Sequence, residues 1–269
     1  MGRAVRQGRA AGAAGVALAA LVGTLLAGCS GDQEPSSPSS PSSPADSPTS
    51  STPATPSSTT PPVTSQPVGT GCRAGGGRVP AGANSAPTAD LDLDGVPDQL
   101  WLVDQDDQRV LGVKTATGAT FSTTFAGAAP QTASAIGQRL GGSDPGIVLL
   151  DTGRSVELYT TTDCELTPTT DDEGEPWSFD LGFTGYGTGV GCADLGSGLQ
   201  LVGLLSEDDG EGGFRVTRTA IELDDFGRTA RGGDTEVLAE HADADDPVVE
   251  SAHTVTCGDQ DEGVPEPRP

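Results

Sequence analysis

The chain has 269 residues and a formal net charge of −25 at pH 7, because 39 aspartates and glutamates outnumber 14 lysines and arginines. A surface this acidic repels phosphate groups, which argues against nucleic acid as a partner and against direct binding to anionic lipid headgroups. Glycine is abundant, with 39 residues, and aromatic residues make up 4% of the chain. Short strands joined by tight turns use glycine in this way, whereas long helices do not.

The N-terminal segment has the pattern of an export signal. Three arginines within the first nine residues precede an apolar run at 10–25, which is too short for a transmembrane helix and suits a signal-peptide core. The run ends in Leu-Ala-Gly-Cys at 26–29, which resembles the lipobox of bacterial lipoproteins. That resemblance implies cleavage after a signal peptide at 1–28 and acylation of Cys29, and two acyl chains suffice for stable anchoring. The alternative is an ordinary signal peptide with a chance cysteine.

Residues 29–70 are rich in Pro, Ser and Thr, with repeated Ser-Ser-Pro and Thr-Pro units. Such a segment cannot bury enough apolar surface to offset the entropy of ordering, so we expect a disordered tether. Proline favours an extended form of about 3.1 Å per residue. We therefore expect the tether to hold a C-terminal domain, residues 71–269, away from the extracytoplasmic face of the cell membrane. This length suits one domain with its own core.

The C-terminal domain alternates between Gly- and Asp-rich loops and short apolar runs, and helix signals are weak throughout. Apolar residues at every second position and the turn residues between runs indicate strands. The expected strands are 99–103, 109–114, 120–125, 147–150, 155–160, 199–205 and 214–223.

The apolar runs that begin at Leu100, Ile147 and Leu199 lie 47 and 52 residues apart. A period near 50 built from short strands is typical of propeller blades or a related repeat. Residues 236–257 are a candidate for a fourth, less regular unit. We therefore expect an all-β fold, a small β-propeller-like domain of three to four four-stranded units.

The acidic segment followed by an apolar strand resembles the FG-GAP/VCBS repeats of integrin-type β-propellers. The resemblance covers residues 86–225 and is best in the first unit. Residues 183–192, which read FTGYGTGVGC, are similar, together with the lipobox, to secreted proteins of high-GC Gram-positive bacteria. That second similarity implies no activity.

Four aspartates in the pattern Asp-x-Asp-x-Asp-Gly-x-x-Asp at 90–98 predict a cation site. Alternating carboxylates converge when a chain wraps around a cation, and Gly95 permits the sharp turn. Hard oxygen donors at this density suit a structural Ca²⁺ better than Mg²⁺, which demands strict octahedral geometry. An EF-hand would need a glutamate where Trp101 stands. The alternative is an acidic turn solvated by water. The expected ligands are the side chains of Asp90, Asp92, Asp94 and Asp98 and the carbonyl of Val96.

The corresponding loops of the later units lack this set of carboxylates. One contains Ser143 and Asp144, and the other contains Asp194 and Ser197. We expect no strong cation site at either loop.

Four cysteines remain if Cys29 is acylated, and an even number outside the cell indicates disulfides, with three possible pairings. We prefer Cys72–Cys257, which would join the ends of the domain, and Cys164–Cys192, which would join neighbouring units. A zinc site is a poor alternative to disulfides, because the sequence contains no Cys-x-x-Cys spacing.

Catalytic signals are absent from the sequence. Both histidines, His241 and His253, lie in the C-terminal part, and His241 neighbours Asp243 and Asp245, where a solvated turn is the ordinary explanation. There is no Gly-x-Ser-x-Gly elbow and no dinucleotide or phosphate-binding motif. We therefore expect a non-catalytic binding or scaffolding module with a protein or glycan ligand. The alternative is a cell-wall or glycan-active hydrolase, because sequence spacing does not reveal a carboxylate pair.

Overall fold

The structure, a computed structural model, describes residues 70–105, 108–126, 132–141, 146–181, 187–260 and 262–268. The expected signal peptide, the expected acylation site at Cys29 and the expected tether up to residue 69 lie outside these residues. The described chain forms three largely antiparallel sheets with very little helix. The all-β expectation is therefore confirmed.

The first sheet has the strand order β1-β5-β4-β3-β2. Its strands are β1 (Gly75–Gly76), β2 (Asn84–Pro87), β3 (Gln99–Gln105), β4 (Gln108–Lys114) and β5 (Ala119–Phe125). Strands β2 to β5 form an antiparallel meander, and β1 adds a short parallel edge to β5. Leu100 pairs with Val113 and Leu102 pairs with Leu111 across β3 and β4. Alternation then places these four buried side chains on one face.

The second sheet has the order β10-β8-β7-β6-β15, and β9 also pairs with β8. Its strands are β6 (Ser134–Arg139), β7 (Gly146–Asp151), β8 (Ser155–Thr160), β9 (Thr167–Pro168), β10 (Ser178–Asp180) and β15 (Val264–Pro265). A short 3-10 turn, η1 (Thr162–Cys164), follows β8. Strand β7 is buried on both faces, which explains its continuous apolar run.

The third sheet is a meander of the long strands β11 (Gly187–Asp194), β12 (Leu199–Asp208), β13 (Phe214–Asp224) and β14 (Thr229–Ala242). The 3-10 turn η2 (Asp225–Gly227) joins β13 to β14, and the helix α1 (Pro247–Ser251) follows. Asp246 caps α1 by accepting a hydrogen bond from the Val248 N–H, and Pro247 takes the first helical position.

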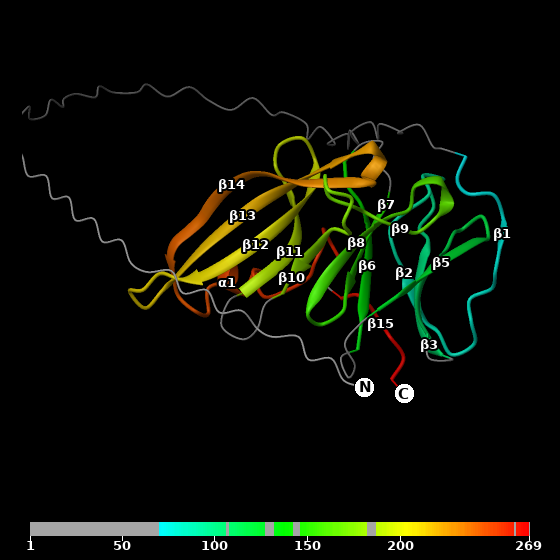
Figure 1. Cartoon of the computed structure of the whole chain (residues 1–269), viewed down its shortest axis with the longest axis horizontal. Helices are drawn as coiled ribbons and strands as arrows, with labels where there is room; N and C mark the ends of the chain where they lie inside the picture. The colour runs from blue at the N-terminus through cyan, green and yellow to red at the C-terminus, as the bar shows by residue number, and fades with distance from the viewer. Residues whose placement is uncertain are drawn as a thin grey trace, which may run out of the picture. The chain divides into compact units, whose positions relative to one another are not determined.

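The second sheet lies between the other two (Figure 1). Val148 and Leu150 of β7 pack with Leu100 and other residues of the first sheet. Their neighbours Ile147 and Leu149 pack with residues of the third sheet, such as Leu201. The far face of the third sheet forms another cluster, in which α1 contributes Val249. The core is therefore a stack of layers.

The predicted repeat agrees with the positions of the three meanders, because β3, β7 and β12 begin at Gln99, Gly146 and Leu199. The expected fourth unit is wrong. Residues 236–257 form the second half of β14, then α1 and a C-terminal segment, and they build no sheet of their own among the described residues. The physical reason is that β14 continues its pairing with β13 through three register shifts instead of ending early.

The disulfides differ from the preferred pairing, which is wrong. Cys72 is bonded to Cys164, and Cys192 is bonded to Cys257. The segment that contains Cys72 lies beside the connection after β8, where η1 carries Cys164. A parallel bridge between Val190 and Val255 brings the next pair together two residues later. Both disulfide pairings follow from how the sheets pack on one another, which cannot be inferred from the sequence.

Candidate metal centre

The acidic loop, residues 90–98, connects β2 to β3 and is closed at its base by backbone hydrogen bonds. The Thr88 N–H donates to the Asp98 carbonyl at 2.9 Å, and the Asp98 N–H donates to the Ala89 carbonyl at 3.3 Å. Leu91 is buried in the core and anchors the loop. Gly95 has a φ of 88°, so the predicted role of this glycine in a sharp turn is confirmed.

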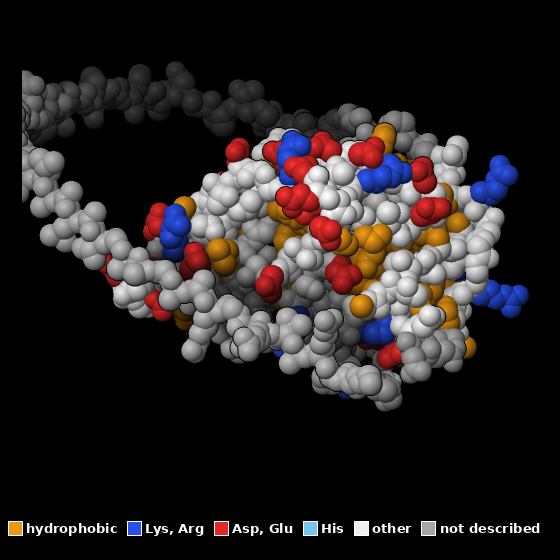
Figure 2. Space-filling view, viewed as in Figure 1, with side chains coloured by type: hydrophobic (Ala, Val, Ile, Leu, Met, Phe, Trp, Pro, Cys, Tyr) orange, Lys and Arg blue, Asp and Glu red, His pale blue; other side chains and the backbone are white. Residues whose placement is uncertain are grey.

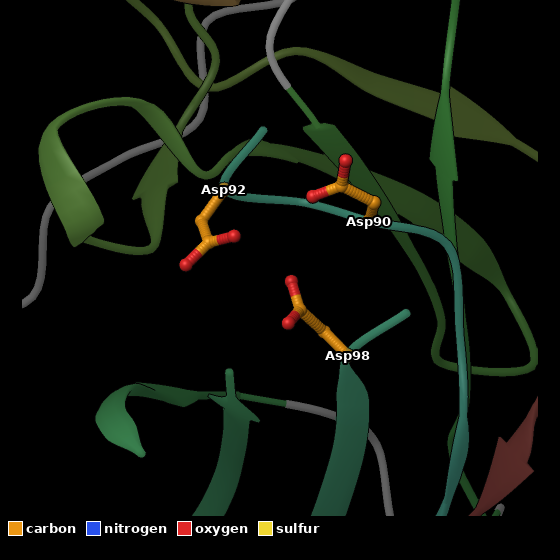
Figure 3. A group of neighbouring side chains, drawn as sticks. All are labelled: Asp90, Asp92 and Asp98. Atoms are coloured by element: carbon orange, nitrogen blue, oxygen red, sulfur yellow. The ribbon is translucent and has the colours of Figure 1, made fainter. Parts of the chain in front are cut away.

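Three carboxylates of the loop converge. Asp90, Asp92 and Asp98 each offer an oxygen atom, and these atoms lie within 4.8 Å of one another. Figure 3 shows the three side chains directed toward a common space. This is the one cluster of at least three potential metal-ligating side chains found among the described residues.

Backbone N–H groups organise the loop around its carboxylates. Asp90 accepts hydrogen bonds from the N–H groups of Asp94, at 3.1 Å, and Gly95, at 3.0 Å. Asp94 accepts one from the Val96 N–H at 2.7 Å. Amide donors of this kind stabilise ionised carboxylates, so the loop keeps its shape through its own polar groups.

Asp98 is the most deeply placed of the three carboxylates, with 1% of the residue exposed. Burial raises the pKa of Asp98 to about 6, and the negative charges of Asp92 and Asp94 act in the same direction. Hydrogen bonds from the N–H groups of Leu91, at 2.9 Å, and Ala116, at 3.0 Å, oppose the rise. A carboxylate that is costly to ionise gains from a nearby cation.

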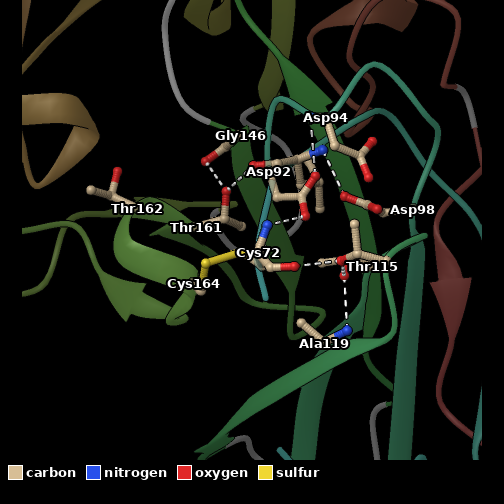
Figure 4. Close-up of a disulfide and its surroundings, with 12 residues drawn as sticks. Cys72, Asp92, Asp94, Asp98, Thr115, Ala119, Gly146, Thr161, Thr162 and Cys164 are labelled. Atoms are coloured by element: carbon tan, nitrogen blue, oxygen red, sulfur yellow. Dashed lines mark hydrogen bonds between the residues drawn. A yellow bond between two sulfur atoms is a disulfide. The ribbon is translucent and has the colours of Figure 1, made fainter. Parts of the chain in front are cut away.

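Asp92 connects the acidic loop to a disulfide. Burial also raises its pKa, and a hydrogen bond from the Cys72 N–H, 2.7 Å long, opposes this rise. Figure 4 shows Cys72 bonded to Cys164 beside the loop. Residue 71, just before Cys72, must be glycine, because a Cβ atom there would lie 2.6 Å from the Asp94 Cβ. The disulfide therefore holds a donor against the candidate ligand.

A cationic side chain from the second sheet also reaches the loop. The Arg139 guanidinium on β6 donates to Asp90 at 3.2 Å. This contact compensates part of the negative charge of the three carboxylates. Neither Arg139 nor Cys72 was expected at the site, because no sequence pattern places these distant residues beside residues 90–98.

The remaining predicted ligands lie in the same loop but outside the cluster. Asp94 is not among the three converging carboxylates and instead closes a turn with the Val96 N–H. The proposed role of the Val96 carbonyl stays a prediction. In the later loops, Ser143 and Asp144 lie outside the described residues. Asp194 accepts hydrogen bonds from the N–H groups of Gly196 and Gly198, as expected for a polar turn.

The two histidines are surface residues. His241 contacts Asp209 through Nδ1, and both side chains belong to the third sheet and its hairpin turn. The pKa of Asp209 is lowered, mainly by the hydrogen bond from the Glu211 N–H. His253 is exposed. The His241–Asp209 contact has no neighbouring nucleophile among the contacts described for either group.

Comparison with protein-family models, with curated proteins and with solved structures finds no match for this chain. Within the described part of the chain, no helix has the length and apolar character needed to cross a bilayer.

Proposed function

We propose that this protein is a cell-surface lipoprotein with a non-catalytic binding or scaffolding domain, and that one structural Ca²⁺ stabilises this domain at the acidic loop. The convergence of Asp90, Asp92 and Asp98 within 4.8 Å carries the proposal. Three carboxylates in partial burial repel one another, and a hard divalent cation with flexible oxygen coordination relieves that repulsion. Asp94 and the Val96 carbonyl remain candidate further ligands.

We further propose that the three sheets are blades of a propeller-type architecture. Each contains an antiparallel meander, and the first two blades follow one another at the spacing expected from the sequence. Alternate side chains of β7 reach both neighbouring sheets, which is how a central blade would pack. Propeller rims are common ligand surfaces, although a fold does not by itself assign a ligand.

A thermal-unfolding titration tests the calcium proposal. Adding Ca²⁺ to EDTA-treated protein at one hundred times the dissociation constant should stabilise it by about 2.7 kcal/mol, which for a domain of this size raises Tm by about 5–10 °C. Asp92→Asn should lose most of this rise, because it removes a charged ligand while an amide oxygen can still accept from the Cys72 N–H. Asp208→Asn, in an exposed turn of the third sheet, is the matched control and should respond like the wild type.

Two results would contradict the calcium proposal. One is an unfolding curve that EDTA and Ca²⁺ leave unchanged. The other is a calcium response that Asp92→Asn retains in full. If Mg²⁺ raised Tm as much as Ca²⁺ does, the loop would still be a cation site, but it would not be specific for calcium.

The anchor is tested in cells. Cys29→Ser should move the protein from the membrane fraction to the medium, because the acyl chains have no acceptor thiol. Asp208→Asn again serves as the control and should stay with the membrane. A Cys29→Ser protein that remains membrane-bound although its signal peptide has been removed would reject the lipid anchor without bearing on the calcium site.

A further inference from the structure

Two cavities flank the turn η2 and share one residue. The larger cavity, of about 710 Å³, lies where the second and third sheets meet and is lined by residues that include Leu140, Gln200 and Glu222. The smaller, of about 320 Å³, adjoins the acidic loop and includes Asp92. Both volumes fall in the range of about 300–1,000 Å³ typical of small-molecule sites. Phe226 belongs to the lining of both cavities.

Phe226 is presented to solvent by a strained backbone. Its residue is 67% exposed and its φ is 58°, and the preceding Asp225 also has a positive φ, of 50°. Bulky residues rarely adopt this conformation, and it persists only where the surroundings enforce it. A scattered exposed apolar side chain is ordinary, but one held in this way between two cavities is not.

The turn is fastened to the second sheet by threonine hydroxyls. Thr160 and Thr162 donate to the Phe226 carbonyl at 2.9 Å and 2.7 Å. Thr169 donates to the Gly227 carbonyl at 2.7 Å. These bonds fix the turn through two backbone carbonyl groups, and the Phe226 side chain remains largely exposed.

The charges around the turn are already paired. Arg231 contacts Glu222 and Asp224, and Arg228 contacts Asp163 and Asp225. Figure 2 shows acidic and basic side chains interleaved over the end of the third sheet where this turn lies. Among the residues described as lining the two cavities there is no lysine or arginine, so an anionic ligand finds no cation facing it.

The remaining polar groups of the larger cavity suit hydroxyl groups. Gln200 and Ser197 are hydrogen-bonded to each other at 2.7 Å and offer both donors and acceptors. The partly exposed Leu199 contributes apolar surface beside them. A ligand that matches this lining is uncharged, carries several hydroxyls and has one flat apolar face for the Phe226 ring.

We propose that the Phe226 turn and its two cavities bind a neutral saccharide, with one sugar ring stacked on Phe226. The proposal rests on the binding function proposed above and gives it a site and a ligand class. It does not require a cation at the acidic loop, so the two proposals can fail separately.

Isothermal titration of the purified domain tests this site with neutral glucan, mannan, galactan and N-acetylglucosamine oligomers as probes. At least one series should bind. Phe226→Ala should weaken that binding about tenfold, the loss expected for one aromatic stacking contact, whereas Phe226→Trp should restore it. Val237→Ala, another exposed apolar residue, is the control on β14 and should bind like the wild type.

A second variant guards against misfolding of the first. The double substitution Ser197→Ala/Gln200→Ala changes the polar lining of the larger cavity and leaves the turn intact, and it should also weaken binding. Equal affinity in Phe226→Ala, or no binding of any probe at 10 mM (about the weakest affinity that titration resolves), would overturn the proposal. Preferential binding of sulfated or carboxylated oligomers would overturn it too. Release of shortened oligomers would support the saccharide site and reject the non-catalytic part of the proposed function.

Discussion

Asp151, at the end of β7, is a partly buried carboxylate whose surroundings disfavour its ionised form. Burial raises its pKa above the ordinary 3.8, and a hydrogen bond from the Gly153 N–H only partly opposes this rise. The folded state therefore holds the proton more tightly than the unfolded state. Stability falls as pH rises from the ordinary pKa through the raised one, and the full cost of ionisation is present above that window.

We predict that Asp151→Asn stabilises the protein at pH 7, because an amide can still accept from the Gly153 N–H without being charged. The expected gain is about 1–3 °C in Tm, and it should vanish at pH 3, where Asp151 is protonated in both states. Asp194→Asn is the matched control, since Asp194 closes a similar but exposed turn. Melting curves at both pH values check this, and an equal gain at pH 3 would contradict the electrostatic explanation.

Whether a residue of the candidate site could be predicted from the sequence depends on how far it lies from the acidic loop along the chain. Asp90, Asp92 and Asp98 were predictable because their spacing within one short loop determines that they can converge. Asp94 shares that spacing but turns to a backbone N–H instead. Arg139 reaches the loop from another sheet, and no local pattern carries that information.

At the scale of elements, the strand positions followed from alternation and from glycine- and aspartate-rich turns. The starts of β3 and β12 were predicted at the observed residues, Gln99 and Leu199. The long pairing of β13 with β14 was not predicted, because bulges break the alternation on which such a prediction depends. Strand β15 was also missed, since two residues carry no periodic signal.

An ion pair fastens the segment after β15 to the first sheet. Glu266 is 5% exposed and accepts from the Arg109 Nε at 2.7 Å and from the Ala133 N–H at 3.2 Å. The Arg109 guanidinium also lies 4.7 Å from the centre of the Phe125 ring. One buried carboxylate thus joins β4 to the segment before β6.

We predict that Glu266→Gln lowers the free energy of unfolding by about 3 kcal/mol, because it removes the carboxylate that interacts most strongly with the partly buried guanidinium of Arg109, and Asp104 and Glu157 interact with it more weakly. The matched control is Glu240→Gln, whose carboxylate pairs with Arg215 on the surface, and it should change stability by no more than about 0.5 kcal/mol. Urea unfolding measures both. Similar changes in the free energy of unfolding for the two variants would show that the Glu266–Arg109 pair does not hold the C-terminal segment to the first sheet.

At the scale of the whole molecule, the two disulfides close loops of similar length, with sequence separations of 92 and 65 residues. They should therefore contribute similarly to stability, about 4.5 kcal/mol each in the chain-entropy description. Their surroundings differ, because only Cys72 donates to a candidate calcium ligand. The pairing depends on how layers stack, which explains why the sequence left three possibilities open.

We predict that Cys72→Ser/Cys164→Ser weakens calcium binding in addition to lowering Tm, since the donor to Asp92 is no longer held in place. Cys192→Ser/Cys257→Ser should lower Tm by a similar amount and leave calcium affinity unchanged. Calcium titration of both folded variants at low temperature separates the two effects, and peptide mapping of the unreduced wild type checks the pairing itself. An equal loss of affinity in both variants would argue against the link through Cys72.

The middle layer of the stack also has a consequence for the order of events in a cell. Strand β15 completes the second sheet beside β6, and Glu266 completes the fastening to the first. During synthesis, a chain that does not yet include residues 264–266 can form neither the β15–β6 pairing nor the Glu266 contact, even though its earlier strands are already present. Under the export proposed above, the chain would pass through a narrow channel unfolded, and contacts that are completed only by residues 264–266 would form after most of the chain has been made.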